Sequence, residues 1–142
     1  MTTIQQLSVF LENREGKLYE VLEAIGAAGI NIIASTVSDT AEYGLFRLIT
    51  SDNEKAFALL KEKGIGVHLT PVIALSLDSK PGSLAAQIKC FSLAGLNIQY
   101  LYSVSVGGKA FIILKFDNNE AALKMMEENH FSTFTIQELA TL

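Results

Sequence analysis

The chain repeats itself, and this repeat limits what it can fold into more than any other feature does. Shifting the sequence by 66 residues aligns its two halves without a gap. The segment Ala28-Gly29-Ile30-Asn31-Ile32 falls on Ala94-Gly95-Leu96-Asn97-Ile98, and Gly16 falls on Gly82. Because these identities keep one register over most of the unit, we expect two copies of one small domain. Their joint is expected near Thr70-Pro71, which gives domains 1–70 and 71–142.

Each copy begins with a period-two pattern followed by a helical one. Alternating apolar residues predict a strand with one face toward a core. These residues are Leu7, Val9 and Leu11 in the first copy and Ile73, Leu75 and Leu77 in the second. Apolar residues then recur at spacings of three and four, which indicates an amphipathic helix. They are Leu18, Leu22 and Ile25, matched by Leu84, Ile88 and Phe91.

The rest of each copy predicts two strands, a helix and a closing strand. The segments Ser51-x-x-Glu54 and Asp117-x-x-Glu120 resemble capping boxes at helix starts. Closing strands are expected at Val67–Thr70 and Phe134–Leu139. A βαββαβ order predicts an α+β fold with two tandem ferredoxin-like units, each an antiparallel four-stranded sheet with two helices on one face.

Composition excludes several classes of protein and of site. With 49% hydrophobic and 18% charged residues the chain is not disordered, and a net charge of −4 disfavours a polyanionic partner. One cysteine, Cys90, excludes an internal disulfide, and His68 and His130 stand alone without metal-ligand spacing. We therefore expect no catalytic residues, no metal and no cofactor. The chain has no membrane-length apolar run, and its start lacks the basic and apolar regions of a signal peptide. A cytoplasmic location is expected.

The sheet face opposite the helices is unusually apolar for a face that water normally covers. Strand parity assigns five bulky residues to it, namely Phe10, Leu45, Ile49, Phe111 and Ile113. The mean hydropathy of +0.32 is also high for a chain of this size. Both observations favour a homodimer, built through sheet edges or over this face.

The pattern resembles the ACT domain family, the small-molecule-binding regulatory modules attached to many enzymes of amino-acid metabolism. The second copy resembles it through the stretch Leu75–Leu84, and both copies do through Gly-x-Asn-Ile at the helix end. The first copy has Glu15 where the family often has proline. The resemblance implies a stand-alone tandem ACT protein that senses an amino acid, without catalysis, as a partner of an enzyme of amino-acid metabolism.

The resemblance also implies ligand sites where two units meet, between the loop of one unit and the helix-end Asn of its neighbour. In the first copy it assigns Asn13, Arg14, Gly16, Lys17 and Leu18 in the loop, with Asn31 and Ile32 after the helix. In the second copy it assigns Ser79, Lys80, Pro81, Gly82, Ser83 and Leu84 in the loop, with Asn97 and Ile98 after the helix.

Physical chemistry agrees with an anion site at such a loop, because free amides and the helix dipole attract a carboxylate. Asn31 and Asn97 open the second strand, which we expect to begin beside the same loop. Their amides suit an amino-acid headgroup, or they serve only as turn residues. Arg14 and Lys80 are ligand contacts or solvated loop charges. Since Glu15 opposes an anion in the first loop, the second loop is expected to be the better carboxylate site.

Two other functions share the predicted fold. An RNA-binding plait stacks bases on sheet aromatics, for which Phe111 is a candidate, but the acidic balance disfavours it. An acylphosphatase-like hydrolase uses an arginine in the first loop, where Glu15 here opposes the anion.

Overall fold

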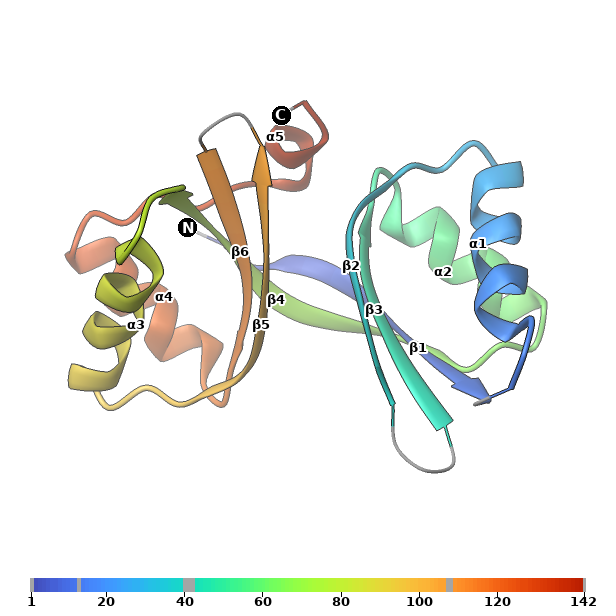
Figure 1. The fold of residues 1–142 in the computed structure, drawn as a ribbon, viewed down its shortest axis with the longest axis horizontal. Helices are drawn as coiled ribbons and strands as arrows, with labels where there is room; N and C mark the ends of the chain where they lie inside the picture. Colours follow the sequence, from blue (N-terminus) through green and yellow to red (C-terminus); the bar gives the residue numbers. More distant parts are fainter. Residues whose placement is uncertain (1, 13, 40–42, 107–108, 142) are drawn as a thin grey trace. The chain divides into compact units, whose positions relative to one another are not determined.

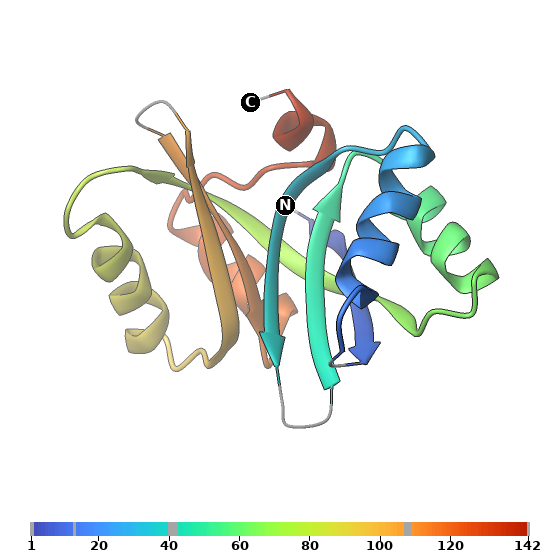
Figure 2. The same ribbon diagram turned by 45° about the vertical axis from the view of Figure 1, so that its right-hand side comes forward.

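The computed structural model describes residues 2–12, 14–39, 43–106 and 109–141. Its chain divides into two units (Figures 1 and 2). The N-terminal unit is Gln5–Thr70, and the C-terminal unit is Pro71–Leu142 together with Met1–Ile4. The described part of the chain contains six strands, paired antiparallel where their registers are defined, and five helices. None of these helices is long and apolar enough to span a membrane. The predicted α+β class is confirmed.

The N-terminal unit places two helices on one face of its sheet (Figure 1). Its elements are β1 (Ile4–Glu12), α1 (Lys17–Ala27), β2 (Ile32–Asp39), β3 (Tyr43–Thr50), α2 (Asn53–Glu62) and the first residues of β4 (Val67–Asp78). The strands lie in the order β2-β3-β1-β4. The start of β4 joins β1 through the Ser8 and Thr70 hydroxyls, whose oxygens lie 2.9 Å apart.

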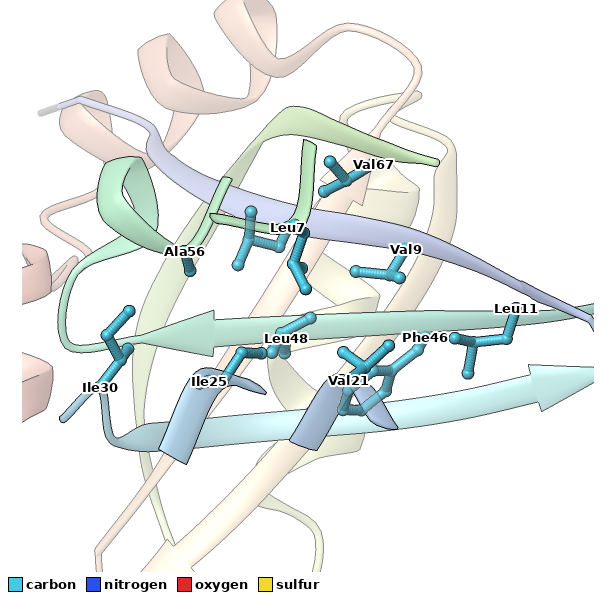
Figure 3. Close-up of a cluster of buried hydrophobic side chains, with 11 residues drawn as sticks. Leu7, Val9, Leu11, Val21, Ile25, Ile30, Phe46, Leu48, Ala56 and Val67 are labelled. Atoms are coloured by element: carbon cyan, nitrogen blue, oxygen red, sulfur yellow. The ribbon is translucent and has the colours of Figure 1, made fainter. Parts of the chain in front are cut away.

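Alternating strand residues and one stripe of α1 form the core of this unit (Figure 3). Leu7, Val9 and Phe46 point into it and are at most 2% exposed. From α1 the buried residues are Val21 and Ile25. The predicted helix face was therefore partly wrong, because Leu18 and Leu22 lie at the edge of the buried stripe, 37% and 36% exposed.

The C-terminal unit repeats this plan around Phe91 and Phe116, whose ring centroids lie 5.1 Å apart. Its further elements are α3 (Ser83–Leu93), β5 (Ile98–Val106), β6 (Lys109–Phe116), α4 (Asn119–Glu128) and α5 (Ile136–Ala140). The strands lie in the order β4-β6-β5. β4 joins in one strand the two strands that the sequence predicted on either side of Pro71.

The predicted closing strand at Phe134–Leu139 is wrong. The segment before it does lie along β4, since the Ser76 amide donates to the Ser132 carbonyl and the Phe134 amide to the Ala74 carbonyl. Pairing is limited there to one bridge, between Thr133 and Leu75. The chain then turns into α5 because Thr135 and Glu138 form a capping box, which satisfies backbone amides at a helix start.

The sheet face opposite the helices is only partly exposed to solvent. Ile49, Phe111 and Ile113 are buried, and the Phe111 ring packs against Phe134 at 6.3 Å. Phe111 therefore offers no exposed ring on which a base would stack. Phe10 stays 42% exposed, and its ring lies 5.4 Å from that of His68.

Candidate functional site

The loops before α1 and α3 have the same backbone conformation. Gly16 and Gly82 are the N-cap residues of these helices, with φ of 84° and 86°. The Arg14 and Lys80 amides donate to the carbonyls of Glu12 and Asp78, two residues earlier. Such φ values lie in the left-handed region, which glycine enters without steric cost. The repeated glycines thus set the path of both loops.

The helix starts that follow these loops lack side-chain caps, unlike the other three helices. The N-caps of α2, α4 and α5 are Asp52, Asn118 and Thr135, and each side chain accepts a bond from a first-turn amide. No side chain does this at Gly16 or Gly82 among the described residues. The Lys17 and Ser83 amides donate to the Arg14 and Lys80 carbonyls, at 3.5 and 3.2 Å, and the first-turn amides that follow them keep their capacity to bind an anion.

In the N-terminal loop, both cationic side chains are already paired with carboxylates. Arg14 Nε lies 2.9 Å from Glu12 Oε2, and Lys17 Nζ lies 3.4 Å from Glu20 Oε2. Leu18 is exposed beside them, and Asn13 lies outside the described residues. These pairs reduce the positive potential that the loop offers to an anionic ligand.

The C-terminal loop borders an open depression of about 380 Å³. Four predicted site residues line it, namely Ser79, Lys80, Pro81 and Leu84. Lys80 has no carboxylate partner within the part of the chain that the structure describes. This loop therefore combines uncapped helix amides, an unpaired ammonium group and a hollow.

Sequence reasoning missed further residues around this depression. Asp78, Ser103 and Ser105 also line it, and Ser79 Oγ donates to Ser105 Oγ at 3.3 Å. The sequence pattern did not indicate them, because Ser103 and Ser105 alternate regularly with Tyr102 and Val104, and only the register shift between Ile98 and Tyr100 turns them toward the core face.

Asn97 does not lie beside the loop of its own unit, contrary to the sequence-based expectation. Asp78 pairs with Lys109 at one end of β6, whereas the Asn97 side chain donates to Asp117 Oδ2, at 2.8 Å, beyond the other end. An eight-residue strand separates these ends by roughly 24 Å. One small ligand cannot touch both groups within one unit.

The same separation holds in the N-terminal unit. Glu12 pairs with Tyr43 at the start of β3. The backbone amide of Asn31 instead donates to Ser51 Oγ, at 2.9 Å, just after the other end of this strand. Asn31 itself is exposed. Ile32 and Ile98 are half-buried and pack against the two cores, so their first role is structural.

One hydrogen of the Asn97 side-chain amide is committed to an internal bond. Its donation to Asp117, aided by the Gln99 amide and the charge of Lys115, holds the pKa of that carboxyl below its usual value. The pair stabilises the turn between β6 and α4. A ligand at Asn97 would meet the side-chain oxygen and the second Nδ2 hydrogen of Asn97 next to the Asp117 carboxylate.

A second hollow runs along α1 in the N-terminal unit. It has a volume of about 580 Å³ and lies between the helix and the turn Lys63–Ile65. Of the predicted site residues, only Lys17 lines it. A smaller hollow of about 170 Å³ adjoins it and shares Lys17, Glu20, Gly64 and Ile65.

No arrangement for metal binding is found in the described residues. They contain no group of three His, Cys, Asp or Glu side chains able to hold a metal ion. Cys90 is an exposed free thiol on α3, and His68 packs against Phe10 rather than a nucleophile.

Comparison with known proteins identifies the family to which the chain belongs. Residues 1–142 match the family model described as an ACT domain pair. Protein BT0572 from Bacteroides thetaiotaomicron has a similar structure, with a TM-score of 0.94 and 31% identity over 99% of this chain and 98% of that one. No curated protein sequence matches significantly.

Two regulatory subunits of aspartate kinase share the fold at lower identity. The ligand-free subunit from Thermus thermophilus has a TM-score of 0.65 and 18% identity, covering 90% of this chain and 93% of that one. The subunit from Thermus flavus has a TM-score of 0.61 and 17% identity, covering 90% and 92%. Together with the repeat and its two glycine loops, the family match places the chain among the ACT domain pairs.

Proposed function

We propose that the chain is a non-catalytic regulatory protein that binds a small α-amino acid at the loop before α3. The observation that carries this proposal is the depression beside an uncapped helix start and the unpaired Lys80. The amides and the ammonium group suit the ligand carboxylate, and Asp78 on the same rim suits its α-ammonium group. Leu84 and Pro81 supply apolar contact.

The N-terminal loop is the weaker site in this proposal. Its backbone is the same, but Arg14 and Lys17 are neutralised by Glu12 and Glu20. A carboxylate bound there would compete with two side-chain carboxylates for the same cations. The repeat therefore gives two similar loops with unequal electrostatics.

The Asn97 and Asn31 regions enter this function only through a second unit. Since loop and Asn lie at opposite ends of one sheet, a ligand that touches both must be shared between units. Those units belong to one chain or to two copies of a homodimer. By the family resemblance, the bound state would be transmitted to an enzyme of amino-acid metabolism.

A thermal-shift screen against the twenty amino acids tests the proposal. An amino acid present at 100 times its dissociation constant should add about 2.7 kcal/mol of stability. The matched variants Lys80→Ala and Arg14→Ala locate the site, because each removes one exposed loop cation. Lys80→Ala should weaken binding and Arg14→Ala should leave it nearly unchanged. Absence of any shift, or the reverse order of the variants, would contradict the proposal.

A further inference from the structure

The edge strand β5 carries two serines on the sheet face that holds the core. Ser103 is the register partner of Ile112, a fully buried core residue, and Ser105 is the partner of Ala110. Directly paired residues of antiparallel strands share a face. At the position equivalent to Ser103, the N-terminal unit has Val37 opposite Phe46. The C-terminal unit thus has a hydroxyl where its repeat has an apolar side chain.

These serines face the depression at the α3 loop rather than the packed core. Both are exposed, and both line the hollow with Ser79. The bond from Ser79 Oγ to Ser105 Oγ, at 3.3 Å, uses one donor and leaves the Ser105 hydroxyl proton available. The Ser103 hydroxyl has no hydrogen-bond partner among the described residues, so its donor and acceptor capacity is also available.

The charged groups of the hollow and its serines can bind different parts of an amino acid. Lys80 and the α3 amides match its carboxylate, and Asp78 matches its ammonium group. Ser103 and Ser105 are then left for the side chain. An apolar ligand side chain against them would strip water from hydroxyls without replacing its hydrogen bonds.

We infer that this site selects an α-amino acid whose side chain carries a hydroxyl or an amide, and that Ser103 and Ser105 determine this selectivity. The inference rests on the proposed function, since it concerns the same site. It adds the class of ligand and assigns a role to strand residues outside the loop.

Isosteric ligand pairs separate hydrogen bonding from size. Threonine against valine and asparagine against leucine differ in polarity at nearly constant shape. In calorimetry with the full chain, each polar member should bind about fivefold to tenfold more tightly than its apolar partner, the effect of one net hydrogen bond. Equal binding within both pairs would overturn the inference while leaving the proposed function intact. Absence of binding by any amino acid would overturn both.

Three variants test whether the serines cause the preference. Ser103→Val installs the residue that the N-terminal unit has, at an exposed strand position where valine is favourable for folding. It should bring the ratio of threonine affinity to valine affinity close to one. Ser103→Thr keeps the hydroxyl and should preserve this ratio. If the ratio survives in the Ser103→Val, Ser105→Val double variant, another group selects the ligand and the inference fails.

Discussion

Asn53 and Asn119, related by the repeat, make the same pair of bonds in the two units. The Asn53 side-chain oxygen accepts from the Thr50 amide at 2.9 Å, and its nitrogen donates to the Gln5 carbonyl. The Asn119 oxygen accepts from the Phe116 amide at 3.0 Å, and its nitrogen donates to the Pro71 carbonyl at 2.9 Å. Each amide thereby joins a helix start to the preceding strand and to the strand that opens the unit.

Replacing Asn53 with alanine should destabilise the protein by about 1–3 kcal/mol, because two backbone groups lose their partner in a site where Asn53 is 7% exposed. Asn119→Ala should cost less, since Asn119 is only half-buried and its bond to Pro71 lies near solvent. Urea unfolding followed by circular dichroism measures both. The neighbouring exposed residues Glu54 and Glu120, replaced by alanine, are the matched controls. Equal losses in all four variants would contradict this role.

The sequence pointed to these helix starts but misplaced the capping residues. The predicted boxes began at Ser51 and Asp117, whereas the side chains that cap the helices are Asp52 and Asn118. A one-residue error is expected from sequence, because several neighbouring polar residues can all serve as caps. The role of Asn53 and Asn119 was not predictable, since their partners Gln5 and Pro71 lie 48 residues away.

The repeat and the strand alternation predicted most of the fold, and local chemistry explains where they failed. The repeat predicts a strand at Phe134–Leu139 because Val67–Thr70 is one, yet Thr135 and Glu138 cap a helix there. Likewise, the predicted core stripe of α1 contains Leu18, Leu22 and Ile25, of which Ile25 is buried, while Val21 takes the second buried position. A helical period identifies a face only to within one residue, about 100° of rotation.

For the candidate site, the glycine loops could be found from the sequence and the strand contribution could not. Gly16 and Gly82 stand out as repeated residues before helices. Ser103 and Ser105 reach the loop only because β5 and β4 both pair with β6, a pairing that joins residues far apart in the sequence. The Asn97 expectation failed for the same reason, because register decides which strand end lies near the loop.

The carboxyl of Asp117 should make folding stability depend on acid pH. Its folded-state pKa is lowered, chiefly by the Asn97 amide, so the unfolded state binds protons more readily. The stabilisation is present above the unfolded pKa near 3.8 and is lost as pH falls through the lower folded value. Urea unfolding between about pH 5 and pH 2.5 should show a steeper loss in the wild type than in Asp117→Asn. Parallel curves would exclude this contribution.

A homodimer remains a prediction, and the structure favours open strand edges over the apolar sheet face as its contact. Since Ile49, Phe111 and Ile113 are buried within one chain, the open strand edges are the stronger motive. β5 is an edge strand without a charged residue, so little protects it from pairing with another strand. Light scattering at micromolar concentration should give twice the 15.4 kDa chain mass. Leu101→Lys, at a 36% exposed position of β5, should lower this mass, and a monomeric wild type would refute the prediction.

Substituting Gly82 and Gly16 in parallel separates folding from binding. An added Cβ at either position meets no atom within 4 Å, so the cost of alanine arises only from φ values of +86° and +84°. Both Gly→Ala variants should therefore lose about the same stability, roughly 1–2 kcal/mol. Asparagine, which tolerates the left-handed region better, should lose less at both positions.

Binding should differ, because only the Gly82 loop has an unpaired lysine and the serine-lined hollow. Calorimetry on the folded variants should show weaker amino-acid binding for Gly82→Ala than for Gly16→Ala. Equal binding losses at equal stability would show that the α3 loop is not the preferred site.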